Sequence, residues 1–191
     1  MNLSDLGYFN EIEIYRKDNN LDFLDVGRVI LEHKERYVVK TPDLEYEAEI
    51  IGNLRYSAQS RRDFPAVGDW VAFLGYDNNK ALIHAVLPRK SLVERQAVGK
   101  KGEKQIIAAN IDFAFIVQAV GRDFSLSRIE RYLTICYDAN IEPIIVLNKT
   151  DLVDAGEKAN LINMIQNRVK DVPVFAISNQ SLNGIEALRN S

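Results

Sequence analysis

The chain has 191 residues, of which 47% are hydrophobic and 27% charged, and its formal net charge is −3 at pH 7. This balance is typical of a soluble globular protein and excludes a low-complexity or disordered chain. The single cysteine, Cys136, excludes a disulfide framework within the chain, and with only two histidines it excludes a four-ligand zinc site of Cys and His. Residues 1–20 lack the pattern of a secretory signal, and no apolar run approaches the roughly 20 residues of a membrane span, so we expect a cytoplasmic protein.

Residues 1–25 form an acidic leader, with six Asp or Glu residues against Arg16 and Lys17. Ser4 is a suitable N-cap for one short helix in this segment. Because chain termini are poorly ordered unless something ties them down, we expect the leader to be a solvated arm.

Residues 26–97 show the rhythm of strands that are short, rich in β-branched and aromatic residues, and separated by turn signals. The strand-like segments are residues 26–33, 36–41, 45–51, 69–75, 81–87 and 91–96. Five or six strands of this kind predict a small closed barrel, and an OB-like barrel is the commonest solution. We expect Trp70 in the barrel core and a long loop at residues 52–68, which lack strand rhythm.

A polar, glycine-containing segment at residues 98–107 is expected to link the barrel to a second domain at residues 108–191. Three apolar runs in this domain are typical of parallel strands buried on both faces. They are residues 109–120, 141–147 and 172–178. Helical patterns lie between them, with Ser127 and Asp154 as expected N-caps. The alternation predicts part of a doubly wound α/β domain.

Asn148, Lys149 and Asp151 form an N-K-x-D motif directly after the second apolar run. Open α/β sheets bind ligands beyond the carboxyl ends of their strands. A carboxylate there suits guanine, because it can accept hydrogen bonds from the ring N–H and the exocyclic amine, a pair that adenine does not offer. The Asn148 amide can donate to the purine N7, and the Lys149 stem can lie over the base. The three fixed residues of an N-K-x-D motif also occur by chance in roughly a few per cent of chains. The prediction of a guanine site therefore depends on the position of the motif directly after an apolar strand.

Ser178 and Asn179 end the third apolar run. Guanine-nucleotide proteins place a Ser-Ala pair there, whose backbone N–H reaches the guanine carbonyl. The backbone donor survives the change to Asn179, so we include both residues in the predicted guanine site.

The phosphate side of a nucleotide site has no counterpart in the sequence. The only Gly-Lys pair, Gly99-Lys100, has Glu94 and Lys101 where a P-loop needs Gly and Ser or Thr, and D-x-x-G does not occur. Either the N-K-x-D motif is accidental, or the domain is circularly permuted and its phosphate motifs lie beyond residue 191.

Five collinear segments point to the second alternative. They are LRYSAQSRRDFPAVGDWVAF (54–73), IHAVLPRKSLVER (83–95), QIIAANIDFAFIVQAV (105–120), DFSLSRIERYL (123–133) and PIIVLNKTDL (143–152). The chain thereby resembles the N-terminal part of the ribosome small-subunit-dependent GTPase A family (RsgA, YjeQ/YloQ). This resemblance implies an OB-fold barrel followed by half of a circularly permuted GTPase domain, with the P-loop, the switch elements and a C-terminal zinc domain missing.

The resemblance implies a GTPase of late small (30S) ribosomal subunit maturation, which binds rRNA through the barrel and GTP or GDP through the NKTD motif. Mg²⁺ and Zn²⁺ are expected only in the full-length family member. Because phosphate and magnesium contacts supply the catalysis of phosphoryl transfer, we expect no hydrolysis by these 191 residues alone. No catalytic nucleophile, carboxylate pair or metal-ligating cluster stands out in the sequence. An alternative is a non-catalytic OB-fold RNA-binding module with a remnant nucleotide-binding half.

Basic residues cluster in the long barrel loop and between residues 87 and 107. A phosphate-contacting surface and a solvated basic linker fit this pattern equally well, and the resemblance favours contact with rRNA. The candidates are Arg55, Arg61, Arg62, Arg89, Lys90, Arg95, Lys100, Lys101 and Lys104. Tyr56 and Phe64, beside the arginines, are aromatic residues that can stack on bases, although such residues are more often packed in cores or loops.

By resemblance to the Ras-like sheet, the three apolar runs are neighbouring strands. Residues 109–120 then form an open, apolar edge, which is an association hazard. We therefore expect a dimer or strand swap through this edge, or partial disorder of the second half.

Overall fold

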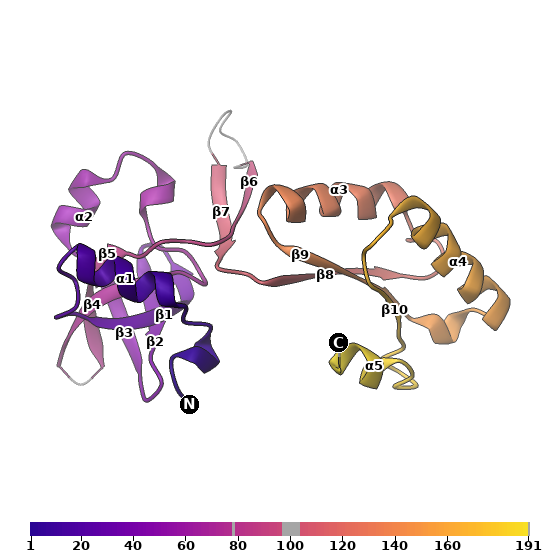
Figure 1. Ribbon diagram of the computed structural model, residues 1–191, viewed down its shortest axis with the longest axis horizontal. Helices are drawn as coiled ribbons and strands as arrows, with labels where there is room; N and C mark the ends of the chain where they lie inside the picture. Colours follow the sequence, from indigo (N-terminus) through magenta and orange to yellow (C-terminus); the bar gives the residue numbers. More distant parts are fainter. Residues whose placement is uncertain (78, 97–103, 191) are drawn as a thin grey trace. The chain divides into compact units, whose positions relative to one another are not determined.

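The computed structural model describes residues 1–77, 79–96 and 104–190. The chain divides into two units, Met1–Ile111 and Asp112–Ser191, and each has its own sheet (Figure 1). None of the described helices is long and apolar enough to cross a bilayer.

The first unit contains a closed barrel of five strands, which confirms the predicted OB-like architecture (Figure 1). The strands are β1 (Asp25–His33), β2 (Arg36–Lys40), β3 (Glu45–Ile50), β4 (Trp70–Tyr76) and β5 (Lys80–Val86). Their order is β1-β2-β3-β5-β4, and β4 closes the barrel by pairing with β1. The β3–β5 pair is parallel and the other four pairs are antiparallel.

Alternate side chains of the five strands fill the barrel, as the two-residue period of a strand requires. The fully buried ones include Val29, Val39, Phe73 and Ile83. At Gly27 on β1 a Cβ would lie 2.5 Å from Cγ1 of Val39, so this position has no room for a side chain.

Two short helices lie in the segment between β3 and β4, where we predicted a long loop. They are α2 (Gly52–Ser57) and the 3₁₀ helix η2 (Arg61–Asp63). Ser60 and Asp63 form a capping box at η2, and the carboxylate accepts the backbone N–H groups of Gln59 and Ser60. These two backbone donors lower the pKa of Asp63.

The prediction of a solvated leader is wrong. The leader forms the 3₁₀ helix η1 (Ser4–Leu6) and the helix α1 (Asn10–Asp18). Ile12 of α1 is fully buried in a cluster with Trp70 and Leu87 of the barrel, and the Tyr8 ring meets Trp70 edge-on at 4.9 Å. Burial of apolar surface therefore ties the leader down.

The placement of Trp70 also differs from our prediction. Trp70 is fully buried, but it belongs to the leader cluster, whereas Val71 and Phe73 of the same strand fill the barrel. Trp70 and Val71 point to opposite faces because neighbouring residues of a strand alternate. The indole is thus buried on the outer face of the barrel by α1.

The sixth predicted strand lies outside the barrel. It is β6 (Leu92–Gln96), and it pairs antiparallel with β7 (Lys104–Ala109) in a separate two-stranded sheet. Of the predicted linker at residues 98–107, residues 98–103 lie outside the described residues, and residues 104–107 belong to β7. The described part of this segment is therefore strand, and the first unit continues to Ile111.

The second unit contains a parallel sheet of order β10-β9-β8 with helices between its strands (Figure 1). The elements are β8 (Phe113–Ala119), α3 (Leu126–Asp138), β9 (Glu142–Asn148), the 3₁₀ helix η3 (Thr150–Leu152), α4 (Ala155–Arg168), β10 (Val174–Ala176) and α5 (Ile185–Arg189). This arrangement confirms the predicted partial α/β domain.

Of the three predicted N-caps, Ser4, Ser127 and Asp154, only Asp154 is confirmed, and Ser4 lies inside η1, whose N-cap position is Leu3. Asp154 accepts the N–H of Glu157 at the start of α4, as expected. The cap of α3 is Ser125, which accepts the N–H of Arg128, and Ser127 lies inside the helix. Ser125 and Ser127 both stand just before the apolar residues of α3, so the sequence pattern alone does not show which of them caps the helix.

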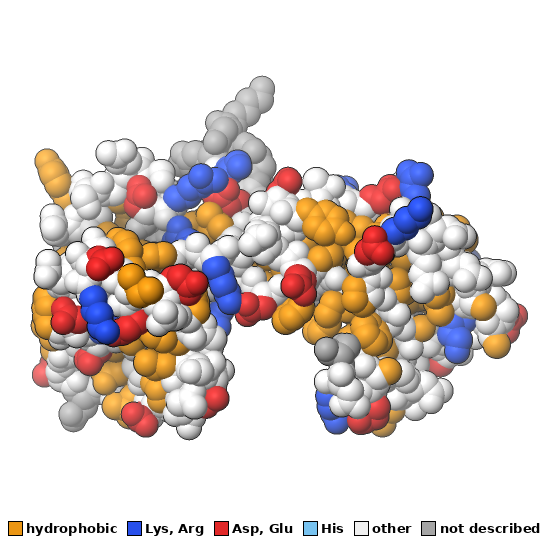
Figure 2. Space-filling view, viewed as in Figure 1, with side chains coloured by type: hydrophobic (Ala, Val, Ile, Leu, Met, Phe, Trp, Pro, Cys, Tyr) orange, Lys and Arg blue, Asp and Glu red, His pale blue; other side chains and the backbone are white. Residues whose placement is uncertain are grey.

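The sheet is not buried on both faces, contrary to our prediction. Phe113, Phe115 and Val117 of β8 alternate on one face and are 57–59% exposed. Ile116 and Gln118, on the other face, are buried. Hydrophobic side chains gather over this sheet in the space-filling view (Figure 2).

Candidate functional site

The guanine-site candidates come together at the carboxyl end of the sheet. Asn148 is the last residue of β9, and Lys149 and Asp151 follow it directly. Ser178 and Asn179 follow β10, which pairs parallel with β9. Because both strands end at the same edge, residues nearly 30 positions apart in the sequence lie at one ligand-binding edge.

The turn after β9 has a left-handed residue at Lys149. Its φ is 61° and its ψ is 33°, a conformation that costs a non-glycine residue about 1–3 kcal/mol. Asn148 Oδ1 accepts the N–H of Lys149 at 2.7 Å, and Lys149 O accepts the N–H of Leu152 at 3.0 Å. These bonds hold the tight turn that leads from β9 into η3, which contains Asp151.

A side-chain hydrogen bond joins the two loops. Ser178 Oγ donates to Asp151 Oδ1, and the same Oγ accepts the N–H of Ser181 at 3.1 Å. Ser178 is fully buried, whereas Asp151 is exposed. The serine therefore orients the carboxylate, while the carboxylate remains accessible to a ligand.

The backbones of the two loops are also joined. Thr150 donates its N–H and its hydroxyl to Ile177 O, at 3.2 and 3.0 Å. Ser178 donates its N–H to Asn183 O at 3.0 Å. The N–H of Asn179, which we expected to face a guanine carbonyl, has no hydrogen-bond partner among the described residues. A backbone donor is thus left for a ligand at this edge.

Gly184 closes the loop that carries Ser178 and Asn179. Its φ is +79°, and a Cβ at this position would lie 2.2 Å from Ala176 O. Only glycine fits such a position without strain. Gly184 was not among the predicted site residues, although Asn-Gly is a recognisable turn signal.

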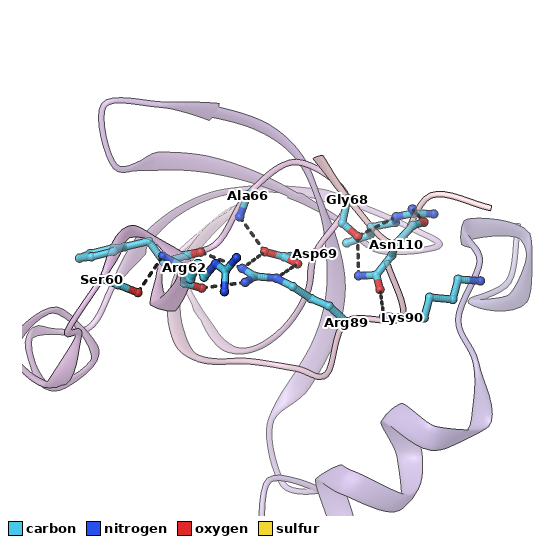
Figure 3. A network of polar contacts seen from close by, with 10 residues as sticks. Ser60, Arg62, Ala66, Gly68, Asp69, Arg89, Lys90 and Asn110 are labelled. Carbon is cyan, nitrogen blue, oxygen red and sulfur yellow. Dashed lines mark hydrogen bonds and ion pairs between the residues drawn. The ribbon is translucent and has the colours of Figure 1, made fainter. Parts of the chain in front are cut away.

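Among the basic candidates, Arg89 has its charge compensated inside the barrel unit (Figure 3). Its Nε and Nη2 donate to both carboxylate oxygens of Asp69 at 2.7 and 2.6 Å, and it also donates to Arg62 O and Phe64 O. Asp69 is fully buried and accepts the N–H of Ala66. This bidentate pair fastens the η2 segment to the start of β4.

Arg62 is paired as well. Its guanidinium makes two hydrogen bonds with the Glu94 carboxylate, and Lys104 Nζ lies 3.5 Å from the same carboxylate. The hydrogen bond from Arg62 lowers the pKa of Glu94. One carboxylate thus partly neutralises two of the basic candidates.

The other basic candidates have different environments. Arg55 pairs with Glu35 at 2.7 Å, and Arg95 donates to Gln105 at 3.3 Å. Lys90 Nζ lies 5.3 Å from the centre of the Phe9 ring. Arg61 is exposed and has no ion-pair partner in the part of the chain that the structure describes. Lys100 and Lys101 lie outside the described residues.

The two aromatic candidates in this segment differ. Tyr56 is 93% exposed on α2, whereas Phe64 is partly buried against the barrel core. Phe64 is therefore held in place, and Tyr56 projects into solvent.

Asn110 is a buried polar residue that the sequence analysis missed. Its Oδ1 accepts the N–H of Lys90, and its Nδ2 donates to Gly68 O (Figure 3). Arg28 donates to Asn110 O and Gly68 O. Asn110 thereby fastens β7 to the barrel, and its φ of 53° suits the tolerance of Asn for left-handed backbone.

The described residues contain no group of three or more His, Cys, Asp or Glu side chains placed to hold a metal ion. Cys136 is buried on α3, and burial raises the pKa of its thiol.

A family model described as RsgA GTPase matches residues 86–191 of the chain. Among curated relatives, the small ribosomal subunit biogenesis GTPase RsgA 2 of Lactiplantibacillus plantarum is 38% identical over 164 residues, which is 86% of this chain and 46% of that protein. RsgA 1 of Bacteroides thetaiotaomicron is 33% identical over 190 residues, which is 100% of this chain and 53% of that protein. The chain spans about half the length of the curated relatives it matches.

Two solved structures share the fold. YjeQ from Thermotoga maritima superposes with a TM-score of 0.67 at 24% identity, over 86% of this chain and 55% of that chain. YloQ, described as a circularly permuted GTPase, gives a TM-score of 0.64 at 20% identity, over 87% of this chain and 55% of that chain. The barrel and the partial α/β unit therefore occur together in known proteins.

Proposed function

Because the chain belongs to the RsgA GTPase family, we propose that it supplies the barrel and the guanine-recognition half of a GTPase that acts in maturation of the small ribosomal subunit. The names of the curated relatives support this proposal. Action on ribosomes implies a cytoplasmic location. The partners are the small subunit with its rRNA and a guanine nucleotide.

Guanine binds at the carboxyl end of the parallel sheet. The observation that carries this assignment is the hydrogen bond between Ser178 and Asp151, which joins two loops and leaves an accessible, oriented carboxylate at the edge. Asp151 accepts the two donors of the guanine edge, Asn148 and Lys149 frame the base, and the N–H of Asn179 donates to the guanine carbonyl. The accepting carboxylate of Asp151 and the donating N–H of Asn179 match the hydrogen-bonding edge of guanine and not that of adenine.

The 191 residues alone do not hydrolyse GTP. The sequence contains neither a P-loop nor D-x-x-G, and in phosphoryl transfer the phosphate and magnesium contacts supply the catalysis. Mg²⁺ and Zn²⁺ belong to parts of the family's architecture outside this chain.

Ribosomal RNA binds to the barrel unit through its basic residues. Arg61, Lys104 and Arg95 are exposed and available for phosphate contacts, and OB barrels commonly bind nucleic acid. Of the remaining candidates, Arg55, Arg62 and Arg89 are paired with carboxylates, and Lys100 and Lys101 lie outside the described residues.

The apolar edge strand β8 favours self-association of the isolated chain. β8 is the outer strand of the sheet, and its exposed face carries Phe113, Phe115 and Val117. Unpaired strand edges with apolar side chains associate readily. We assign a dimer of this chain to that edge.

The guanine assignment is tested by NMR titration of the chain with GTP, ATP and XTP at millimolar concentration. GTP is expected to shift the amide signals of residues 148–151 and 177–180, and ATP to leave them unchanged. Asp151→Asn should prefer XTP, because xanthine replaces the exocyclic amine with a carbonyl that the new amide can donate to. Asp138→Asn, an exposed change at the end of α3, is the matched control. Equal shifts with GTP and ATP would refute guanine recognition.

A further inference from the structure

The motif after β9 contains one residue to which the proposed guanine site gives no role. Thr150 occupies the third position of N-K-x-D, where the motif allows any residue. Its N–H and its hydroxyl both donate to Ile177 O, at 3.2 and 3.0 Å. A carbonyl oxygen has two lone pairs and can accept both bonds. One half-buried residue thus joins the loop after β9 to the loop after β10.

The register of the sheet explains why Ile177 O is open to these donors. β10 pairs parallel with β9, and Ile177 continues the ladder by donating its N–H to Leu147 O at 2.8 Å. In an unbroken parallel ladder the N–H of Lys149 would donate to Ile177 O. That N–H instead donates to Asn148 Oδ1 at 2.7 Å, because the backbone of Lys149 is left-handed. Thr150 therefore supplies the rung that the turn removes.

Ile177 directly precedes the part of the loop that faces the ligand edge. Ile177 is 5% exposed and Ser178 is not exposed at all. Asn179, the next residue, is exposed, and its N–H has no hydrogen-bond partner among the described residues. A binding group has to be held within about 0.5 Å of its productive position. A shift of Ile177, two residues before Asn179, would move this N–H out of place.

The Asp151 carboxylate has supports that do not involve the Thr150 hydroxyl. The N–H of Leu152 donates to Lys149 O at 3.0 Å and closes the turn of η3 that contains Asp151. The carboxylate itself accepts a hydrogen bond from Ser178 Oγ. Loss of the Thr150 hydroxyl should therefore displace the loop after β10 more than it displaces Asp151.

We propose that Thr150 is a positioning residue of the guanine site, whose hydroxyl sets the spacing between the Asn179 N–H and the Asp151 carboxylate. The proposal rests on the proposed guanine binding and adds to it the residue that aligns two of its contacts. Guanine presents its carbonyl and its two donors on one rigid edge, so both contacts form only at one spacing. A residue without a hydroxyl at position 150 cannot hold that spacing.

The test is an NMR titration of the isotope-labelled 191-residue protein with GTP, in which the amide signals of Asp151 and Asn179 are followed together. Thr150→Val keeps the branched shape and removes the hydroxyl. It should weaken GTP binding by about 3- to 10-fold, the usual effect of one hydrogen bond. Thr150→Ser keeps a hydroxyl and should bind GTP like the unaltered protein.

The ratio of the two amide shifts separates positioning from simple stabilisation. A complex as weak as the one expected here dissociates fast, so each GTP-induced shift is the site occupancy multiplied by a value that the local contact sets. The ratio of the Asn179 shift to the Asp151 shift is consequently independent of affinity. It should fall in Thr150→Val, because the Asn179 N–H loses its contact with the guanine carbonyl, and it should return in Thr150→Ser.

Thr134→Val is the matched control. Thr134 on α3 is exposed and donates its hydroxyl to Glu130 O at 3.1 Å, so the substitution removes the same kind of bond away from the sheet edge. This variant should bind GTP like the unaltered protein, with the same ratio of shifts. Urea unfolding followed by circular dichroism verifies that each variant is folded.

The outcomes separate this proposal from the proposed function. If the unaltered protein does not distinguish GTP from ATP, the guanine site fails and the role of Thr150 fails with it. If GTP is recognised and Thr150→Val behaves like Thr134→Val, the positioning role is wrong and the guanine site stands. If Thr150→Val reduces both shifts in proportion, or Thr150→Ser does not restore the ratio, the hydroxyl does not place the Asn179 N–H and the proposal is overturned.

Discussion

The Arg89 side chain illustrates how partners decide the role of a charged residue. The Arg89 side chain is 15% exposed, and the Asp69 side chain that it pairs with is not exposed at all. Arginine suits such a bidentate pair because its planar fork matches a carboxylate. Charge in this position stabilises the barrel unit directly, whereas Arg61 has its charge free in solvent.

Breaking the Arg89–Asp69 pair should destabilise the barrel unit strongly. Arg89→Ala leaves a buried carboxylate without its cation, and removal of one partner of a buried pair costs about 3–5 kcal/mol. Urea unfolding followed by tryptophan fluorescence measures this loss at Trp70. Arg55→Ala breaks an exposed pair and should cost about 0–1 kcal/mol. If Arg89→Ala and Arg55→Ala lowered the free energy of unfolding equally, the Asp69 carboxylate would not be desolvated as described.

The leader shows how an acidic element becomes part of a fold. Helix α1 has charged residues on most positions, but Ile12 on one face is fully buried and Ile14 is 52% exposed. The buried face covers Trp70 and thereby removes the indole from solvent. A single apolar stripe is enough to dock a short helix when the strand beneath it presents a large aromatic ring.

Ile12→Ala should destabilise the barrel unit by about 2–5 kcal/mol, the usual loss for a fully buried isoleucine. Ile14→Ala on the same helix is the matched control and should change the free energy of unfolding little. The measurement is again urea unfolding, with the Trp70 fluorescence of the folded state as a second readout. A red-shifted emission is expected for Ile12→Ala because the indole becomes more hydrated. A solvated leader would instead make both substitutions neutral.

Strand β8 exposes three large apolar side chains, Phe113, Phe115 and Val117, on one face. Phe115→Lys places a charge at the centre of its exposed face and should abolish self-association without loss of stability, since Phe115 is 57% exposed. Analytical ultracentrifugation of the chain and the variant measures the change. A monomeric unaltered chain with uniformly protected amides at residues 113–119 would contradict the assigned dimer.

The whole chain combines a complete barrel with a three-stranded part of a nucleotide fold. It spans about half of the relatives it matches, and the motifs for phosphate and metal do not occur in its sequence. A good bidentate base contact gives roughly 1–3 kcal/mol of discrimination, whereas association costs about 4–15 kcal/mol in lost freedom. Base recognition without phosphate contacts therefore gives selectivity with little affinity.

We expect GTP to bind the 191-residue chain no tighter than about millimolar and to be released unhydrolysed. Isothermal titration measures the affinity, and phosphate release from GTP measures hydrolysis in the same preparation. Micromolar affinity, or phosphate release above that of Asp151→Asn, would show that the chain contains phosphate contacts that its sequence motifs do not reveal.

The sequence by itself determined the barrel strands, the parallel α/β strands and the residues of the NKTD motif. These features are local: strand periodicity, apolar run length and motif spacing are all encoded within a few consecutive residues. The family resemblance added the circularly permuted order, which no periodicity reveals.

Only the tertiary structure decided that the leader packs on Trp70, that Arg89 is held by Asp69, and that β8 leaves one face open. It also decided that Ser178 orients Asp151. Each of these facts depends on a contact between residues far apart in the chain. Burial and charge pairing are properties of such contacts, because the free energy of a side chain depends on which neighbours replace its water.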